Sequence, residues 1–294
     1  MNIKYIENRK RITKVEEAAN GVSYLSFEPL NKFDFITNGF SSRIGGVSSG
    51  IYTSMNLSFT CGDEEENVRE NFTRMGKALG IDAANMVLAH QTHTANVMKV
   101  DRTHAGMGII KDRNFHDIDG IVTNVEGLCL VTSHADCIPL YFVDPEKKAI
   151  GLAHSGWKGT AGNIAKNVVE MMSQEYGTDP GDVVGVIGPG ICGKCYEISE
   201  DVAEIFKDNY DSEKCLGVVV PRADIEGKYL LDLHKANYYN MLSAGLREDN
   251  IFISDVCTME NADNLFSHRA TQGKRGGMSA FLCINIGYCL CSLE

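Results

Sequence analysis

The sequence predicts a mixed α/β fold, because short apolar runs typical of strands occur together with a few segments of helical periodicity. The stretch 120–153 contains several such runs with little room for helices between them. A purely alternating βαβ order is therefore not expected. No Pro/Ser-rich linker, charge block or fixed-period repeat divides the chain. We expect residues 1–294 to form a single domain, with residues 1–30 as a lead-in of short strands.

Two segments have clear helical periodicity. After Asp63, a predicted N-cap, apolar residues recur at steps of four, three and four, and Gly80 ends the pattern. The segment 161–176 has similar spacing and stops at Gly177. Two shorter helices are predicted, over 199–207 and 233–246.

Seven apolar runs rich in β-branched residues predict strands. Each run is short and is bounded by loop residues, which favours a strand over a helix. The runs are GIVTN (120–124), LCLVTS (128–133), IPLYFV (138–143), AIGLAHS (149–155), DVVGVIG (182–188), IFISDV (251–256) and AFLCINIGY (280–288).

The bulk properties exclude some classes of function. The net charge of −11 argues against nonspecific binding to nucleic acid or to anionic membranes. The N-terminus has no apolar leader, and no apolar run is long enough to span a membrane. We therefore expect a cytoplasmic protein whose ten cysteines are reduced thiols or metal ligands. The sequence does not identify any protein partners.

Reactive side chains are concentrated in three segments, 90–97, 132–145 and 149–163. Each segment places a His or Cys at or just beyond the end of a predicted strand, where a rigid backbone commonly displays catalytic groups. One thiolate and two imidazoles suit zinc, and three protein ligands leave a fourth position for water or substrate. An isolated Cys or His is more often a buried or hydrogen-bonded bystander, so spacing alone leaves both interpretations open.

The motifs in these segments resemble those of the YfiH/YlmD family, also called the multicopper polyphenol oxidase or laccase-domain family. The resemblance is most specific in the combination of HADCIPLYFVDP with GLAHSGWKGT, and it also includes LAHQTHTANV, GPGICGKCYEI and FSHRATQGKRGGMSAFL. It implies a layered α/β/β/α fold with mixed sheets, similar to the catalytic domain of cytotoxic necrotizing factor toxins.

The resemblance also implies a metal site and an activity. The family's ligands, matched position by position, are His93, Cys137 and His154. Zinc is the expected metal and copper the alternative. The implied enzyme is a purine nucleoside phosphorylase that uses phosphate to cleave adenosine, inosine and 5′-methylthioadenosine to the free base and (methylthio)ribose 1-phosphate. Adenosine deaminase activity is expected to accompany it.

Laccase chemistry is not expected, despite the family's older label. A multicopper oxidase needs a large set of histidine ligands, mostly in His-x-His pairs. This chain has eight His residues and no such pair.

Further site residues are proposed from their chemistry. Arg43 and Lys158 are candidate phosphate ligands, Arg43 for its bidentate guanidinium and Lys158 for its place in a Gly-rich segment before a predicted helix. The alternative for Arg43 is a solvated surface charge. The alternative for the Lys158 segment is a tight strand-to-helix turn with no ligand. Asp136, next to Cys137, is a candidate acid/base or ligand-orienting group, unless it points away into a structural hydrogen bond. Asn56 and Trp157 are candidate pocket-wall residues.

One departure from the family pattern concerns an arginine. Where many relatives read Gly-Arg-Met, this chain reads Gly276-Gly277-Met278, so only Arg275 is left as a substitute for that arginine.

Two other functions remain open, and one motif is unassigned. The chain is alternatively a cysteine hydrolase or deamidase, with Cys137 as nucleophile and His154 as base, or a non-enzymatic metal- or partner-binding protein. Cys192 and Cys195 form a C-x-x-C motif that lacks a second pair at zinc-ribbon spacing. Cys289 and Cys291 are separated by one residue only, which is too close for that pattern. A redox role for the C-x-x-C motif stays open.

Overall fold

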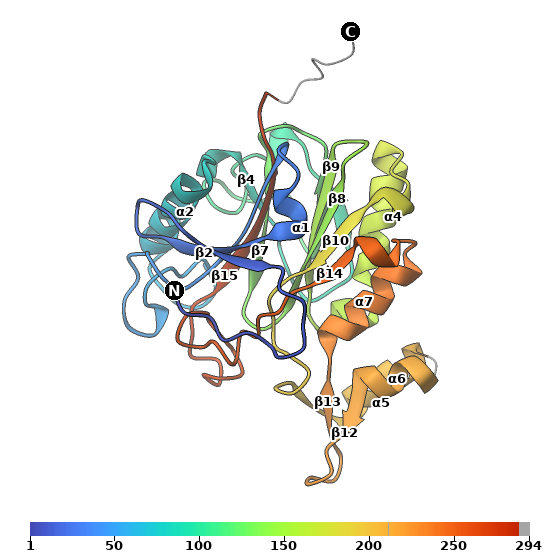
Figure 1. The fold of residues 1–294 in the computed structure, drawn as a ribbon. Helices are drawn as coiled ribbons and strands as arrows, with labels where there is room; N and C mark the ends of the chain where they lie inside the picture. Colours follow the sequence, from blue (N-terminus) through green and yellow to red (C-terminus); the bar gives the residue numbers. More distant parts are fainter. Residues whose placement is uncertain (211, 288–294) are drawn as a thin grey trace.

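Two six-stranded sheets stack face to face, with helices on both outer sides (Figure 1). The structure, a computed structural model, describes residues 1–210 and 212–287. The Cys289/Cys291 pair and the last residue of the strand predicted over 280–288 lie outside these residues. The layered, mixed α/β architecture confirms the predicted fold class, whereas the likeness to the toxin domain stays a prediction.

The first sheet combines three N-terminal strands, the C-terminal strand β15 and two strands from the middle of the chain. Its pairs are antiparallel except for the parallel pair of β4 with β7. The strand order is β1 (Thr13–Glu17), β2 (Ser23–Phe27), β3 (Ile36–Ser41), β15 (Met278–Ile284), β7 (Cys129–His134), β4 (Met86–Leu88). The predicted lead-in thus supplies β1 and β2, followed by the short helix α1 (Glu28–Asn31).

The second sheet carries most of the strands predicted from the sequence. It is antiparallel in its middle and parallel at both edges, where β10 pairs with β14 and β5 with β6. The strand order is β14 (Ile251–Ile253), β10 (Val184–Ile187), β8 (Ile138–Asp144), β9 (Ala149–Ser155), β6 (Gly120–Thr123), β5 (Val97–Lys99). All seven predicted strands are present in the two sheets.

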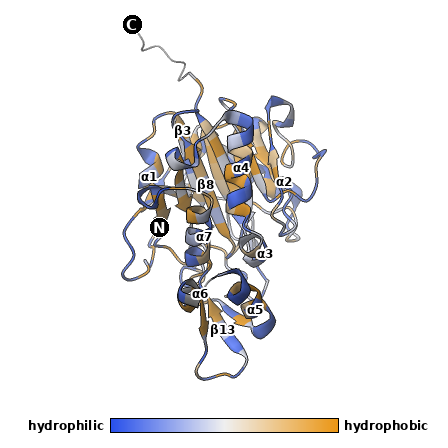
Figure 2. Cartoon of the chain, turned by 90° about the vertical axis from the view of Figure 1, so that its right-hand side faces the viewer, coloured by the Kyte–Doolittle hydropathy of each residue, from blue (hydrophilic) through white to orange (hydrophobic). Residues whose placement is uncertain are grey.

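Three apolar cores hold these layers together. The inner faces of the two sheets enclose the first core, in which the Phe27 and Tyr141 rings meet edge to face at 5.0 Å. Helix α2 (Glu65–Leu79) packs on the outer face of the first sheet. Helices α4 (Ile164–Tyr176) and α7 (Leu233–Ser243) cover the second sheet. Figure 2 shows the largely hydrophobic strands around β8 behind α4.

Two predicted helix starts are wrong by one to three residues. The N-cap of α2 is Glu64, because the Asp63 carboxylate instead accepts hydrogen bonds from Asn56 Nδ2 and the Glu64 N–H. The helix predicted over 161–176 begins only at Ile164. Asn163 has a left-handed backbone (φ 52°) and caps α4, so the preceding residues form a separate short helix, α3 (Trp157–Ala161).

A third sheet was not predicted from the sequence. Strands β11 (Glu197–Ser199), β12 (Val219–Pro221) and β13 (Lys228–Leu231) form it together with helices α5 (Glu200–Asn209) and α6 (Ser212–Val218), and this unit projects below the two large sheets in Figure 1. Five single 3₁₀ turns complete the described elements: Gly50–Tyr52, Ala83–Asn85, Arg102–His104, Pro180–Asp182 and Glu248–Asn250. Among the described helices, none has the length and apolarity to cross a membrane.

Candidate metal centre and active site

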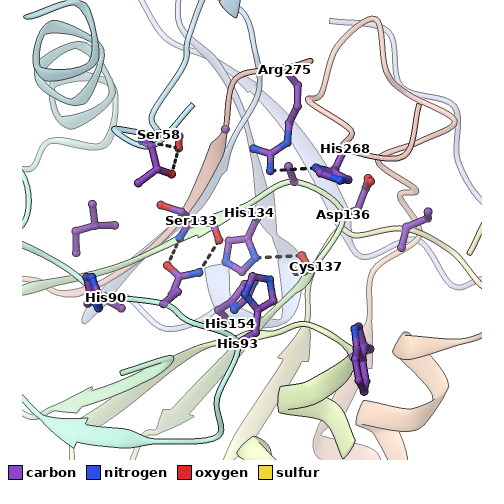
Figure 3. Close-up of a pocket in the computed structure, with 18 of the residues that line it drawn as sticks. Ser58, His90, His93, Ser133, His134, Asp136, Cys137, His154, His268 and Arg275 are labelled. Atoms are coloured by element: carbon purple, nitrogen blue, oxygen red, sulfur yellow. Dashed lines mark hydrogen bonds between the residues drawn. The ribbon is translucent and has the colours of Figure 1, made fainter. Parts of the chain in front are cut away.

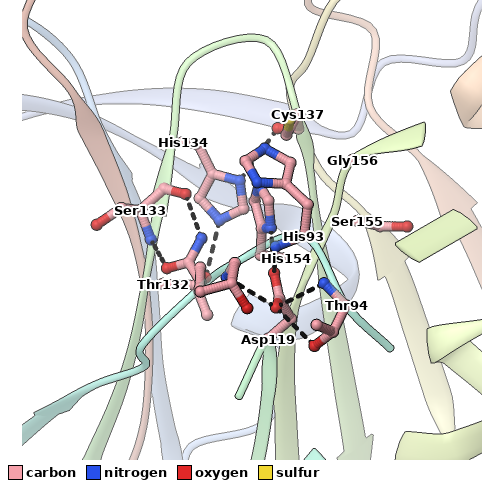
Figure 4. Close-up of polar contacts among 12 residues, drawn as sticks. His93, Thr94, Asp119, Thr132, Ser133, His134, Cys137, His154, Ser155 and Gly156 are labelled. Carbon is pink, nitrogen blue, oxygen red and sulfur yellow. Dashed lines mark hydrogen bonds and ion pairs between the residues drawn. The ribbon is translucent and has the colours of Figure 1, made fainter. Parts of the chain in front are cut away.

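The fold brings the three predicted metal ligands together. His93 lies on the loop between β4 and β5, Cys137 in the turn between β7 and β8, and His154 on β9. One ligand atom from each of them lies within 4.8 Å of the others. The three His- and Cys-containing segments therefore meet, and Figure 4 shows the side chains of His93, Cys137 and His154 close to one another.

The space between the three side chains fits a metal ion. Gly156 borders it, and a Cβ added there would lie 3.0 Å from His93 Cδ2 and 3.1 Å from Cys137 Sγ. A glycine at this position keeps the centre of the cluster open. Two imidazoles and one thiolate are a donor set that zinc and copper both accept, with a fourth position left for another ligand.

Asp119, which sequence reasoning missed, positions two of these ligands. Its buried carboxylate lies 2.8 Å from His154 Nδ1, so Nε2 of that ring is left to face the cluster. It also accepts hydrogen bonds from the backbone N–H groups of Thr92, His93 and Thr94. These bonds hold the His93 loop in place. The sequence signal was the segment DGIVTN (119–124), in which Asp119 directly precedes the buried strand β6 and which resembles the family's motif.

Charge couples Cys137, His154 and Asp119. Burial alone would raise the pKa of the Cys137 thiol, but the His154 charge and hydrogen bonds from both histidines outweigh it and lower that pKa to about 6. Burial alone would lower the pKa of His154, whereas the Cys137 thiolate and Asp119 raise it to about 9. In the metal-free protein at neutral pH, Cys137 is thus a thiolate, the form that binds metals.

We expect Asp119→Asn to weaken metal binding by about 10-fold, because partners that orient a histidine ligand typically contribute about 10–100-fold to affinity. The amide can still accept from His154 with its oxygen, but its NH₂ group then faces backbone N–H donors. Metal affinity is measured by competition with a chromophoric chelator. Asp101→Asn is the matched control, since Asp101 is an exposed carboxylate that caps a 3₁₀ turn. Equal affinities in the two variants would contradict the role of Asp119.

His134 is a second residue that sequence reasoning did not single out. Its ring is buried and lies 5.3 Å from the His154 ring. Nε2 lies 2.8 Å from Thr132 Oγ1, and Nδ1 lies 3.0 Å from the Cys137 carbonyl oxygen. Burial and the His154 charge hold the pKa of His134 well below its usual range. A neutral His134 therefore fixes the Cys137 turn and is not a candidate ligand.

The triad opens onto a cavity of about 560 Å³ (Figure 3). This volume suits a small-molecule ligand of nucleoside size. Its aromatic wall includes Phe59, Trp157 and Tyr196, so the pocket-wall position predicted for Trp157 agrees with the structure. Besides the metal-ligand triad and His134, its cationic and imidazole side chains are Arg113, Arg269, Arg275, His90 and His268.

Arg275 is the cationic group best placed to receive an anion. Its guanidinium donates to the Gly276 carbonyl at 3.1 Å, and another of its terminal nitrogens lies 3.5 Å from His268 Nδ1. Among the residues that the structure describes, its buried Nε has no hydrogen-bond partner. Arg275 thus has donor capacity that its protein partners leave unused, and the residue lines the cavity.

The structure does not bring Arg43, Lys158 or Asn56 to the cavity lining. The Arg43 guanidinium donates to two backbone carbonyls, those of Thr53 and Ala262, at 2.8 and 2.9 Å. Lys158 is exposed on α3. Asn56 is fully buried and supports the cavity wall without lining it. Its Oδ1 accepts hydrogen bonds from the N–H groups of Ser58 and Gly277, which line the cavity.

Asp136 lines the cavity, but its carboxylate has structural partners. It accepts hydrogen bonds from Thr258 Oγ1 at 2.6 Å and from the Arg269 N–H at 2.7 Å. Asp136 lies in a turn with φ 83° and not in a strand, so strand alternation does not set its direction. Its observed bonds match the structural alternative considered for it, and they tie two distant segments to the Cys137 turn.

Known proteins are similar to this chain in sequence and in fold. Residues 37–285 match the model of a family described as multi-copper polyphenol oxidoreductase laccase. The purine nucleoside phosphorylase YlmD of Bacillus subtilis is 34% identical over 251 residues, which are 83% of this chain and 87% of that protein. The adenosine deaminase RL5 of an unknown prokaryotic organism is 31% identical over 247 residues, 82% and 93% of the two chains. The crystal structure of the Bacillus licheniformis hypothetical protein YfiH has a TM-score of 0.85 at 32% identity, covering 92% of this chain and 99% of that chain.

Proposed function

The chain belongs to the multi-copper polyphenol oxidoreductase laccase family, with YfiH and YlmD among its relatives, and on that premise we propose that it is a metal-dependent purine nucleoside phosphorylase. Its proposed substrates are adenosine, inosine and 5′-methylthioadenosine together with phosphate. An accompanying adenosine deaminase activity is proposed from the likeness to RL5. The observation that carries the proposal is one cavity that contains both the metal-ligand triad and the Arg275–His268 group.

The reaction requires an anion site and a nucleoside site in the same cavity. A phosphate oxygen forms a bond to C1′ while the bond from C1′ to the purine nitrogen breaks, and the purine leaves with a proton. We assign the phosphate to Arg275 and His268, since guanidinium and phosphate oxygens pair in bidentate fashion. Trp157 and Tyr196 offer aromatic faces against which the nucleoside can pack.

The metal would be held by His93, Cys137 and His154. When bound, it supplies Lewis acidity at its open coordination position. The protein's own contribution is positional: Asp119 keeps His154 in one tautomer and His134 holds the Cys137 turn. Asp136 keeps the segments of Thr258 and Arg269 against the cavity.

Adenosine turnover with and without phosphate tests the proposal. We expect phosphate-dependent adenine and ribose 1-phosphate, separated by chromatography, and a loss of both products on chelation. Inosine formed without phosphate would show the deaminase activity. If neither inosine, adenosine nor 5′-methylthioadenosine were consumed by the metal-loaded protein, the proposed function would be wrong.

A cysteine hydrolase is the second candidate function. Cys137 and His154 form a thiolate–imidazolium pair, and Asp119 orients the imidazole as the third member of a nucleophilic triad would. This candidate predicts an enzyme that is inactivated by alkylation and not by chelation. The phosphorylase proposal predicts that chelation inactivates it.

We expect Cys137 in the metal-free protein to react with iodoacetamide with a midpoint near pH 6. The lowered pKa of about 6 makes it mostly thiolate above that pH, and its reactivity falls as the pH drops through 6. Added zinc should protect it. Peptide mass spectrometry across pH 5–9 measures both effects, with Cys137→Ser confirming the labelled site. Unchanged labelling in the presence of zinc would contradict ligation by this thiol.

A further inference from the structure

A second group of sulfur ligands lies in the C-x-x-C segment that the proposed function does not use. Cys192, Cys195 and Cys257 place their Sγ atoms within 4.8 Å of one another. Two thiolates bound tetrahedrally at about 2.3 Å would be about 3.8 Å apart, which this spacing accommodates. All three are free thiols.

The backbone around the cluster is arranged as in a metal-binding turn. The N–H groups of Cys195 and Tyr196 both donate to the Cys192 carbonyl, at 2.9 and 3.1 Å, so the C-x-x-C segment turns tightly and places its two thiols side by side. The Cys192 N–H points at Cys257 Sγ, 3.3 Å away. Backbone N–H donors to sulfur stabilise thiolates.

A fourth ligand is available from the protein. Glu260 lies three residues after Cys257, and its Oε1 is 4.0 Å from Cys195 Sγ. Cys257 is buried and Cys195 is half-buried, whereas Cys192 and the exposed Glu260 line an adjoining surface hollow. The cluster thus has a closed side and an entry side for an ion. A disulfide would pair two of these thiols and leave the third without a role.

We propose that Cys192, Cys195 and Cys257 bind a structural zinc ion, with Glu260 as the fourth ligand. Three thiolates and one carboxylate, all groups that bind zinc, form a closed four-coordinate set, and structural zinc sites are four-coordinate. The C-x-x-C lacks a second pair along the sequence because its third thiol comes from a segment about sixty residues away, brought close by the bridge between Gly190 and Cys257.

The site would join two segments that build the active-site wall. The Ile191 N–H donates to the Asp136 carbonyl at 2.9 Å, and Thr258 Oγ1 donates to the Asp136 carboxylate. Ile191 and Tyr196, which flank the C-x-x-C, both line the cavity. A zinc ion here would therefore fix the position of Asp136, the neighbour of Cys137.

Cobalt spectroscopy on the full chain tests this proposal. In Cys137→Ser, which removes the thiolate of the first site, we expect the reduced, metal-free protein to bind Co²⁺ with a thiolate-to-cobalt charge-transfer band. One equivalent of Zn²⁺ should bleach that band. The additional change Cys257→Ser, or Cys195→Ser if that variant fails to fold, should abolish it. Cys215→Ser is the matched control, because Cys215 is a free thiol outside the cluster.

Two results would overturn the second zinc site. One is a folded Cys137→Ser protein, checked by circular dichroism, that shows no charge-transfer band. The other is a band that persists in both cluster variants. Neither result bears on phosphorolysis, since nucleoside turnover is measured separately with the wild-type chain.

Discussion

We expect Cys137→Ala to lower nucleoside turnover by more than about 1000-fold. Loss of a residue that only orients a metal ligand typically costs about 10–100-fold, and loss of the ligand itself should cost more. The change leaves two imidazoles without the thiolate that completes the donor set. The fold should survive, because Cys137 lies in a turn at the cavity and not in one of the apolar cores. The free energy of unfolding should change by less than about 1 kcal/mol.

The measurement combines steady-state kinetics with metal analysis and thermal unfolding. Cys215→Ala is the matched control, a free and partly exposed thiol distant in sequence from the triad. We expect the control to keep wild-type turnover and metal content. A Cys137→Ala protein that turned over adenosine at the wild-type rate would remove the basis for the proposed metal centre.

The second large effect is expected for Arg275→Gln, which should raise the KM for phosphate by about 100-fold. A guanidinium that donates two hydrogen bonds to a charged oxygen contributes about 3 kcal/mol, and 1.4 kcal/mol corresponds to a factor of about ten. Arg275 lines the cavity beside His268, so its guanidinium is the cation that phosphate would meet there. The KM for nucleoside should change much less, because Gln keeps the cavity wall filled.

Arg43→Gln separates the phosphate role from a general effect of losing an arginine. Arg43 donates to the carbonyls of Thr53 and Ala262 and lies over the Phe266 ring. We expect this variant to lose stability and to keep the wild-type KM for phosphate. The opposite pattern would be a raised KM for phosphate in Arg43→Gln and an unchanged KM in Arg275→Gln. It would show that phosphate binds at Arg43, as the sequence predicted, and not at Arg275.

The amino-acid sequence predicted most strands of the two large sheets and, through its resemblance to a family, the candidate metal ligands. The apolar, β-branched runs became β7, β8 and β9, and the spacing that ends at Gly80 became α2. Strands and helices of this kind can be predicted locally, because the spacing of apolar residues along a short segment indicates which of the two forms. The motifs identified the family and pointed to His93, Cys137 and His154, which the structure places within 4.8 Å of one another.

Which other side chains belong to the site depends on the tertiary structure. Asp119 reaches His154 across 35 residues because β6 pairs with β9, and Arg43 reaches Ala262 across 219 residues instead of entering the cavity. The third thiol beside the C-x-x-C came from Cys257 in the same way. Strand pairing and long side chains join residues far apart in the sequence, and no local pattern encodes which of them meet.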